Sequence, residues 1–303
     1  ELAMAKGADF IIGPLDRENA RQLVNQVMPS IPVLLLNKIE RSASDDIFQF
    51  GLDPETEVQQ VADQAALENF SHALAIVPDD QWGERHIKAF KEYWEEKGRT
   101  LVDTIHYLPT DNFEKIIGKT LGIDESEQRA RQISRMLRTP VQANPRRRQD
   151  IDFVFLLAPT TDAIKLRPSL SLHYAEDIPM YSTSYIYDST ERKVNQMDLS
   201  NIRFCDIPLK LQGYNEFQKQ LLQNWPATKG PLARFYAMGA DAYLLQQRIR
   251  QMQTIPQLRV YGATGILSLD NDNTLDRQLT WAYFSQGQAK PMPVLMGGFD
   301  RNP

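Results

Sequence analysis

Cysteine is nearly absent from this sequence, since Cys205 is the only one among 303 residues. A lone cysteine excludes an internal disulfide and any metal cluster built from cysteines. Histidine is scarce as well, and none of the four histidines stands at metal-ligand spacing from a glutamate or a cysteine. We therefore expect neither a metal site nor a cofactor.

Motifs that activate a nucleophile or hold a nucleotide are also missing. The sequence contains no Gly-x-Ser-x-Gly elbow and no Gly-x-Gly-x-x-Gly fingerprint. Gly118-Lys119-Thr120 looks like the end of a phosphate-binding loop, but Phe113 occupies the position of the first glycine that such a loop requires. Because no nucleophile is combined with a base and an orienting acid, we predict that the chain is not an enzyme.

One acidic turn carries part of a calcium-loop pattern. Asp270, Asp272 and Thr274 have the spacing of the first three ligands of such a loop. Leu275 and Trp281, however, stand where the loop needs a glycine and a glutamate. A plain turn between two strands is therefore the favoured interpretation.

Long hydrophobic runs and an excess of positive charge are absent too. No apolar run approaches the roughly 20 residues that span a bilayer, and the net charge is −5. Such a charge gives no overall attraction to nucleic acid or to anionic lipid. With 42% apolar and 24% charged residues, the composition is that of a globular protein. We expect this chain to be soluble and to have no nucleic-acid partner.

The rest of the sequence is organised around one stretch, in which Arg146, Arg147 and Arg148 lead into the apolar run 151–158. A run of this length, bounded by charge on one side and proline on the other, is typical of a strand covered on both faces. The segment that follows begins like a capped helix. We therefore predict an inner strand of a parallel sheet, followed by a loop and a helix.

Strand and helix patterns alternate along most of the chain. This order predicts an α/β fold with doubly wound, mainly parallel sheets flanked by helices. There are more strand–helix units than one sheet normally holds, so two lobes are expected. The predicted strands include 8–14, 32–37, 48–52, 73–77, 100–107, 151–158, 179–185, 203–208, 265–269 and 279–284, and the longest predicted helix covers 232–252, with Phe235, Met238, Ala242 and Leu245 on one face.

The two predicted lobes are each built from two separate parts of the chain. Crossings near Gly51, Pro208 and Asn271 would form a hinge on which such lobes can close. The chain opens with the tail of a helix, so we expect an amino-terminal part of lobe 1 to lie outside this sequence. The predicted lobe 1 comprises 1–50 and 212–270, and the predicted lobe 2 comprises 51–211 and 271–303.

Arginine is concentrated in one segment. Residues 128–149 contain seven arginines and no acid. One interpretation is a solvated helix face with ion pairs to Asp150 or Asp152, which contribute little when exposed. The other is a patch that docks an acidic protein surface or a polyanion, because guanidinium groups suit carboxylates and phosphates. The residues predicted to dock a partner are Arg135, Arg138, Arg146, Arg147 and Arg148.

Several polar and aromatic residues follow strands, where an α/β sheet places its ligands. Backbone amides at helix starts, together with aromatic rings, could hold a small ligand between the lobes. The alternative is that these acids cap helices and that the rings pack between lobes. The cleft candidates are Asp16, Arg17, Asn19, Asp79, Gln81, Trp82, Tyr185 and Tyr187.

With this order established, the chain resembles the type I periplasmic binding proteins over nearly its full length. The features that carry the resemblance are the segment Gly-Ala-Asp-Phe-Ile-Ile-Gly-Pro at 7–14, the loop at 79–83, Gly-Ala-Asp-Ala at 239–242 and Thr-Gly-Ile-Leu-Ser-Leu-Asp at 264–270. More specifically, the chain resembles the carboxy-terminal domain of the LppC family. That likeness rests above all on Pro-Arg-Arg-Arg-Gln-Asp-Ile-Asp at 145–152, and also on Gly13-Pro14-Leu15 with Asn19, Leu166-Arg167-Pro168, the run 178–184 and Ile207-Pro208.

The resemblance implies a regulatory role rather than a reaction. Members of this family are outer-membrane lipoproteins that reach across the periplasm and stimulate the transpeptidase of a class A penicillin-binding protein, a peptidoglycan synthase. The expected partner is therefore such a synthase. The family's helical-repeat domain and lipidated cysteine are not contained in this sequence, so membrane attachment is expected only through a lipid anchor outside it.

The first turn departs from the pattern of the amino-acid-binding relatives. Those sensors follow the first Gly-Pro with small hydroxyl residues, whereas Leu15, Asp16, Arg17 and Glu18 stand here. Asp16 and Glu18 would repel the carboxylate of an amino acid unless Arg17 compensates. The main alternative to the activator is a solute receptor for a small ligand, such as a cell-wall fragment, and an enzyme without a recognisable motif is a third option.

Overall fold

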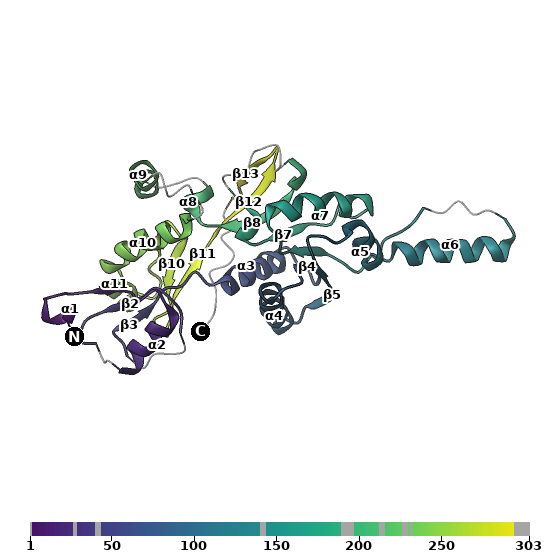
Figure 1. The fold of residues 1–303 in the computed structure, drawn as a ribbon. Helices are drawn as coiled ribbons and strands as arrows, with labels where there is room; N and C mark the ends of the chain where they lie inside the picture. Colours follow the sequence, from purple (N-terminus) through teal and green to yellow (C-terminus); the bar gives the residue numbers. More distant parts are fainter. Residues whose placement is uncertain are drawn as a thin grey trace. The chain divides into compact units, whose positions relative to one another are not determined.

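A computed structural model describes residues 2–26, 29–39, 44–139, 144–188, 197–211, 216–225, 230 and 232–293. The chain forms two compact units, which confirms the predicted two-part α/β architecture (Figure 1). Unit 1 comprises Glu1–Thr56 and Ile207–Thr280, and unit 2 comprises Glu57–Asp206 and Trp281–Pro303. The sequence placed the boundaries near residues 51, 212 and 271. Among the described residues, no helix is both long and apolar enough to cross a membrane.

Unit 1 is built on a parallel sheet, ordered β1-β2-β3, and an antiparallel sheet, ordered β11-β10-β9. Gln49 joins the two, because its N–H donates to the carbonyl of Asn273 at 2.9 Å and it forms a bridge with Thr274. The elements are α1 (Leu2–Ala5), β1 (Ile11–Ile12), α2 (Arg17–Gln26), β2 (Val33–Leu35), β3 (Ile47–Gln49), α8 (Pro208–Leu211), α9 (Glu216–Asn224), α10 (Ala233–Gln246), α11 (Ile249–Thr254), β9 (Val260–Tyr261), β10 (Ile266–Leu269) and β11 (Leu275–Gln278).

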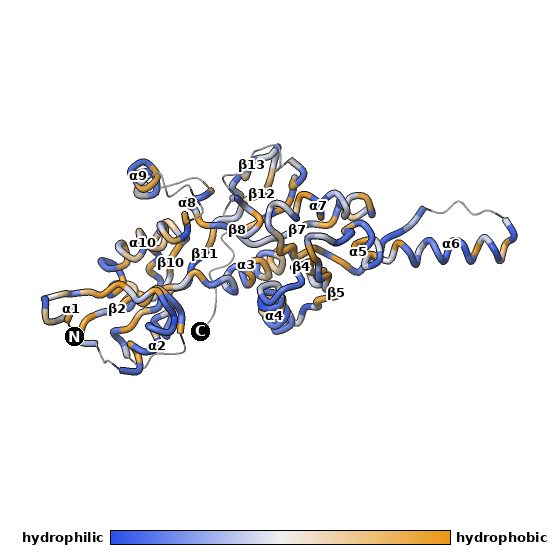
Figure 2. The backbone as a smooth tube through the Cα atoms, in the orientation of Figure 1, coloured by the Kyte–Doolittle hydropathy of each residue, from blue (hydrophilic) through white to orange (hydrophobic). Residues whose placement is uncertain are grey.

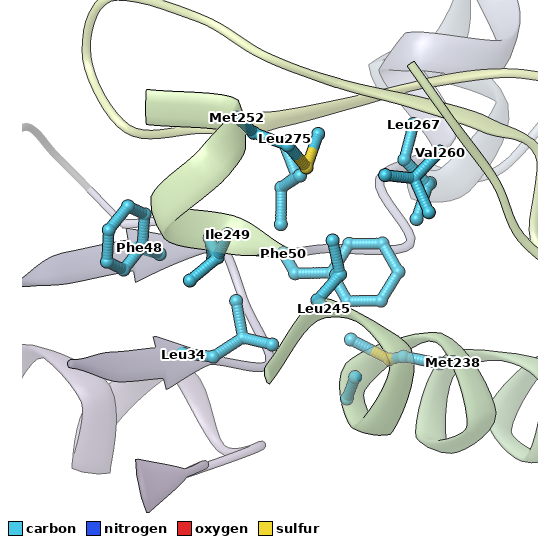
Figure 3. Packing of buried hydrophobic residues seen from close by; sticks show 11 residues of the cluster. Leu34, Phe48, Phe50, Met238, Leu245, Ile249, Met252, Val260, Leu267 and Leu275 are labelled. Atoms are coloured by element: carbon cyan, nitrogen blue, oxygen red, sulfur yellow. The ribbon is translucent and has the colours of Figure 1, made fainter. Parts of the chain in front are cut away.

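The core of unit 1 is assembled from both parts of the chain. Strands β2 and β3 supply Leu34 and Phe48, and the second part supplies the apolar faces of α10 and α11 (Figure 3). This cluster removes its side chains from water, which is the main favourable contribution to folding. Its buried members are Leu34, Phe48, Phe50, Met238, Ala242, Leu245, Ile249, Met252, Val260, Leu267 and Leu275.

Asp241 on α10 is fully buried in unit 1 and ties that helix to the loop before β10. Its carboxylate accepts the N–H of Ala263 at 2.6 Å and both the N–H and the hydroxyl of Thr264, at 2.7 and 2.6 Å. A Cβ on Gly262 would lie 2.5 Å from this carboxylate, so only glycine allows the approach. Burial raises the pKa of Asp241 to about 6, although the three donors act in the opposite direction.

Unit 2 is built on a seven-stranded sheet, ordered β13-β12-β8-β7-β6-β4-β5, in which all pairings from β5 to β8 are parallel. Strands β12 and β13 form an antiparallel hairpin at one edge. Helix α3 (Pro54–Leu67) begins at the boundary. The other elements are β4 (His72–Pro78), α4 (Gln81–Glu96), β5 (Thr100–Tyr107), α5 (Phe113–Thr120), α6 (Ile123–Leu137), β6 (Phe153–Leu156), α7 (Thr160–Leu172), β7 (Met180–Ser182), the 3₁₀ turns Ser184–Ile186 and Met197–Leu199, β8 (Ile202–Asp206), β12 (Thr280–Ser285) and β13 (Gln288–Pro291).

Strand β6 occupies the inner position that the sequence predicted. All four of its side chains are buried, and it pairs with β4 on one side and β7 on the other. The ring of Phe153 lies 5.4 Å from Trp94, 5.7 Å from Tyr181, 5.8 Å from Phe70 and 6.4 Å from Phe90, measured between centroids. Edge-to-face and stacked contacts of this kind add to the free energy gained from burial.

Two element predictions were wrong in detail, and a strand beside β10 was not predicted. The long helix predicted over 232–252 is two helices, because the chain breaks at Gln247 and Arg248, neither of which signals a helix end. The strand predicted over 179–185 ends at Ser182, since the N–H and hydroxyl of Ser184 bind the carboxylate of Glu57 and a 3₁₀ turn follows. The predicted acidic turn is followed by β11, which pairs with β10 and which the sequence did not indicate.

Replacing Phe153 tests how far the unit 2 core depends on it. We expect Phe153→Ala to lower the free energy of unfolding by about 3–5 kcal/mol, because it removes a buried ring that contacts four others. Phe235→Ala is the matched control, since Phe235 is 53% exposed. Urea unfolding of both variants measures the difference. Equal losses in the two variants would show that the Phe153 cluster is not the centre of this core.

Asp241 makes a pH-dependent contribution to stability. Its folded pKa is raised above the ordinary value, so the folded chain binds the proton more tightly and stability from this group falls as the pH rises from about 4 to about 6. We expect the free energy of unfolding of the natural chain to fall, relative to that of Asp241→Asn, by about 2–3 kcal/mol over that range. Urea unfolding of both proteins at each pH measures this difference. If the natural chain instead gains stability relative to Asp241→Asn as the pH rises, the three donors lower the pKa of Asp241 below its ordinary value.

Candidate functional site

The arginine-rich segment before β6 is fixed to unit 2 by its backbone. The N–H of Arg148 donates to the carbonyl of Leu121 at 2.8 Å, and the N–H of Arg146 donates to Oγ of Ser126 at 3.0 Å. Asp152, at the start of β6, accepts the N–H of Ser71 at 2.8 Å and that of His72 at 2.9 Å. The segment therefore has a defined position between the start of β4 and the first turn of α6.

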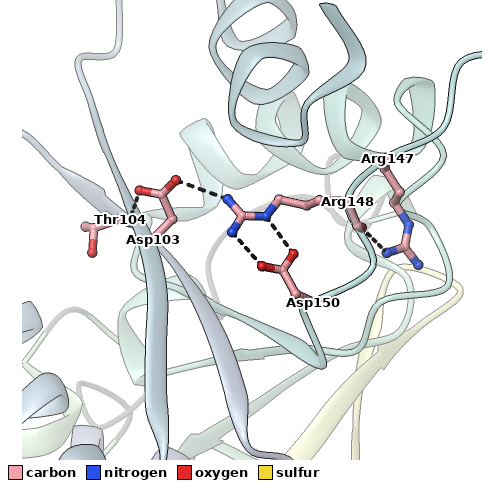
Figure 4. A network of polar contacts seen from close by, with 5 residues as sticks. All are labelled: Asp103, Thr104, Arg147, Arg148 and Asp150. Atoms are coloured by element: carbon pink, nitrogen blue, oxygen red, sulfur yellow. Dashed lines mark hydrogen bonds and ion pairs between the residues drawn. The ribbon is translucent and has the colours of Figure 1, made fainter. Parts of the chain in front are cut away.

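Arg148 forms a two-point ion pair with Asp150 (Figure 4). Its Nε and Nη2 donate to the two carboxylate oxygens of Asp150, both at 2.7 Å, and Nη1 reaches Asp103 at 3.4 Å. This two-point geometry is the one that guanidinium and carboxylate groups favour. Hydrogen bonding from Arg148 lowers the pKa of Asp150, and the same contact raises the pKa of Arg148. The sequence interpretation that pairs an arginine with Asp150 is therefore realised by Arg148.

Arg147 is also held within unit 2. Its side chain is only 11% exposed and pairs with Asp177 at 2.7 Å. It also donates to the carbonyl oxygens of Tyr174 at 2.8 Å and Arg148 at 3.1 Å. Asp177 lies 30 residues away in the sequence, so no local pattern could have predicted this pair. Asp152, the other acid considered, binds His72 at 3.2 Å instead.

The remaining arginines divide into two groups. Arg129 and Arg131 lie on α6 and form pairs with Glu125 at 3.8 Å and Glu127 at 3.7 Å. The side chains of Arg135, Arg138 and Arg146 are exposed and have no carboxylate partner within the part of the chain that the structure describes. Of the five residues predicted to dock a partner, these three are available to one, whereas Arg147 and Arg148 hold the segment in place.

The cleft candidates of unit 1 lie at the start of α2. Oδ1 of Asp16 accepts the N–H of Asn19 at 2.9 Å, which is the contact of a helix cap. Arg17 is the first residue of α2, and its side chain is exposed, as is that of Asn19. These contacts are sufficient to explain the polar residues at this turn.

The cleft candidates of unit 2 lie around the start of α4 and the end of β7. Asp80 caps α4 by accepting the N–H of Gly83 at 2.7 Å, next to Asp79 and Gln81, whose side chains are exposed. A Cβ on Gly83 would lie 2.0 Å from the carbonyl oxygen of Pro78, so glycine is required where the helix leaves the strand. The loop geometry therefore depends on Gly83.

The aromatic candidates of unit 2 separate into two environments. The rings of Trp82 and Tyr185 lie 4.4 Å apart, and Tyr185 is half exposed. Tyr187 instead packs against Phe204 at 5.3 Å and Phe284 at 6.1 Å. Burial raises the pKa of both tyrosines, so each keeps its phenolic proton near neutral pH. That the eight candidates line one ligand cleft stays a prediction.

A cavity of about 670 Å³, which no sequence pattern indicated, lies in unit 1 between α9 and α10. Its lining includes Trp225, Phe235, Tyr236 and Tyr243. Phe235 was placed on the buried face of the long helix together with Met238, but it is exposed and lines this cavity, whereas Met238 is buried. Helical spacing alone did not show where the apolar face ends.

The family follows from comparison with known proteins. Residues 1–287 match the family model described as "LppC putative lipoprotein". The chain belongs to the LppC family. A relative from Vibrio antiquarius, named penicillin-binding protein activator LpoA, is 30% identical over 284 residues, which cover 91% of this chain and 47% of the relative. The LppC chain described here thus spans about half the length of the curated relatives it matches.

Solved structures share the fold of this LppC chain. The C-domain of LpoA from Haemophilus influenzae, described as a regulator of PBP1A, has a TM-score of 0.71 and 22% identity, covering 96% of this chain and 84% of that one. A protein from Chromobacterium violaceum assigned to ABC transporters of branched-chain amino acids has a TM-score of 0.68 and 26% identity, covering 93% and 82%. These likenesses confirm the predicted periplasmic-binding-protein-like fold.

Removing the Arg148 side-chain charge tests its structural role. We expect Arg148→Met to lower the free energy of unfolding by about 1 kcal/mol at pH 7, and Arg129→Met, which breaks an exposed pair, to change it by less than about 0.5 kcal/mol. Because the folded pKa of Asp150 is lowered, the contribution of the pair is present above about pH 4 and is lost as the pH falls through the folded pKa. Urea unfolding at pH 7 and pH 3 measures both effects. If Arg148→Met lowers the free energy of unfolding by the same amount at pH 3 as at pH 7, Arg148 acts by packing alone.

Proposed function

We propose that this chain is a regulatory domain that binds a class A penicillin-binding protein and stimulates its transpeptidase, without carrying out a reaction of its own. The observation that supports this most directly is membership of the LppC family together with a relative named penicillin-binding protein activator, 30% identical across 91% of the chain. Because the chain spans about half of that relative, the proposal assigns it the synthase-binding part of the role.

The place of action is part of the same proposal. The family description names a lipoprotein, and a lipid anchor elsewhere in the full protein would hold it on the periplasmic side of the outer membrane. A class A synthase is bifunctional and works on the peptidoglycan between the two membranes. The described domain would then be the part that reaches the synthase.

The proposed mechanism is allosteric. A binding partner shifts a conformational equilibrium only by the difference between its affinities for the two states. A tenfold rise in the active population therefore requires about 1.4 kcal/mol of tighter binding to the active synthase. No group of this chain needs to enter the synthase active site for that to occur.

The charge of the arginine segment indicates how contact could be made. Arg135, Arg138 and Arg146 present guanidinium groups without internal partners among the described residues, and such groups favour carboxylates on a facing protein. Arg147 and Arg148 act differently, since their pairs with Asp177 and Asp150 fix the backbone from which Arg146 extends. We propose that the first three contact the synthase and that the last two position them.

A solute receptor is the second candidate, and the pair formed by the partly buried Trp82 and the half-exposed Tyr185 favours it. Aromatic faces of this kind suit sugar or peptide fragments of the cell wall. A thermal-shift screen with such fragments tests it, and Trp82→Ala should abolish any shift that depends on this pair. A shift retained by Trp82→Ala would place the ligand elsewhere.

The activator proposal is tested by measuring transpeptidase output of a purified class A penicillin-binding protein from the same organism. We expect the chain to raise the crosslinked fraction and to bind the synthase in a pull-down. Arg146→Glu should weaken binding by about three- to tenfold, because one exposed charge pair is reversed. Lys88→Glu, an exposed charge reversal on α4, is the control and should leave binding unchanged. If the natural chain neither binds nor changes crosslinking, the proposal is wrong.

A further inference from the structure

Helix α6 differs from every other long helix described in unit 2. Of its 15 residues only Ile123, the first, is buried. The helix extends beyond α5 and away from the seven-stranded sheet (Figure 1). Its outer half therefore receives almost no support from the core of unit 2, although a helix of this length is normally stabilised by packing along one face.

The outer half of α6 nevertheless carries an apolar stripe. Ile133, Met136 and Leu137 are 48%, 82% and 62% exposed, and apolar and polar residues alternate along the helix (Figure 2). Spacings of three and four residues place these side chains on one face. This is the pattern of an amphipathic helix that lies in a hydrophobic groove of another protein.

The opposite face of the same half is cationic. At about 100° per residue, Arg131 and Arg135 point away from Ile133, and Arg138 is the C-cap that directly follows the helix. Arg135 and Arg138 have no carboxylate partner within the described residues. The acids of α6 are confined to its first two turns, where Glu125 and Glu127 pair with neighbouring arginines. A partner that covers the apolar stripe would therefore best carry carboxylates at the edges of its groove.

The base of α6 is fixed, whereas none of the described residues buries a side chain of its outer half. The chain returns past its first turn, where Arg148 N–H donates to Leu121 and Arg146 N–H donates to Ser126. The contact between Nη1 of Arg148 and Asp103 on β5, at 3.4 Å, holds the returning segment against the sheet. A projecting helix with a fixed base is pre-organised for binding, so less conformational entropy is lost when a partner covers it.

We propose that the outer half of α6 is the docking element of this domain, and that it lies in an apolar groove with an acidic rim on the peptidoglycan synthase. The inference rests on the proposed function for the identity of the partner, and adds to it the apolar anchors Ile133, Met136 and Leu137. A lipid surface fits less well, because the stripe contains no aromatic residue and the first two turns carry acids that anionic headgroups repel.

Three double variants test the proposal in the same chain. Met136→Ser with Leu137→Ser removes the anchors, and Arg135→Gln with Arg138→Gln removes the charge. Gln128→Ser with Gln132→Ser is the matched control, since it replaces two exposed polar residues of the same helix. Circular dichroism and thermal unfolding establish that each variant folds. We expect the anchor variant to bind the synthase at least about tenfold more weakly, the charge variant severalfold more weakly at low salt, and the control within about twofold of the natural chain.

The outcomes separate this inference from the proposed function. If all three variants bind and activate the synthase like the natural chain, the inference about α6 is overturned and the activator function stands. If the natural chain does not bind, both are overturned. If the anchor variant keeps its synthase affinity but loses binding to phosphatidylglycerol vesicles, or loses self-association in sedimentation, a lipid surface or a second copy is the occupant and the proposal is overturned.

Discussion

The burial of β6 on both faces is the constraint on which unit 2 depends. None of the side chains from Phe153 to Leu156 meets solvent, and the strand lies between β4 and β7. Its start is fixed by Asp152, which accepts two N–H groups from the beginning of β4. The chain just before it must then run along the end of the sheet, which is where the arginines lie. The position of the candidate docking segment thus follows from the position of a core strand.

The arginine segment combines a structural and a recognition role in neighbouring residues. Arg147 and Arg148 satisfy carboxylates of their own unit, while Arg146 extends outward. Two-point guanidinium pairs have a fixed geometry, so they define where the following charges are presented. The pairs of Arg147 and Arg148 therefore fix the local backbone before a partner binds, and Arg146 is presented from that fixed backbone.

Much of the fold could be predicted from the sequence because it is encoded locally. The apolar run after Arg148 indicated an inner strand, and the alternation of strand and helix patterns indicated an α/β fold. Contacts between distant parts could not be predicted in this way. The pairing of Arg147 with Asp177 joins two loops through the tertiary fold, and the exposure of Phe235 depends on what covers α10. The break after Gln246 contains no glycine or proline, and the helical spacing of apolar residues continues across it. The sequence therefore predicted one helix where the structure has two.

The candidate site could be predicted only in part, because its exposure also depends on the tertiary fold. Composition revealed the cluster of arginines, but an amphipathic pattern is the same whether a helix covers its own core or projects from it. Helix α6 has that pattern without the core. Only the three-dimensional fold shows that Met136 and Leu137 are exposed, and therefore that the segment offers apolar as well as charged groups.

The division of the chain into interleaved parts also bears on the order in which its units can fold. Unit 1 needs residues from both Glu1–Thr56 and Ile207–Thr280, so the whole of unit 2 separates its first strands in the sequence from α10 and α11, which cover them. The five parallel strands of unit 2 all lie in the single stretch of sequence that ends at Asp206. Unit 2 can therefore form its central sheet while the apolar faces of β1, β2 and β3 are still unburied. Such faces are exposed to misassembly until the second part of unit 1 packs on them, so the folding of unit 1 depends on the folding of the unit inserted in it.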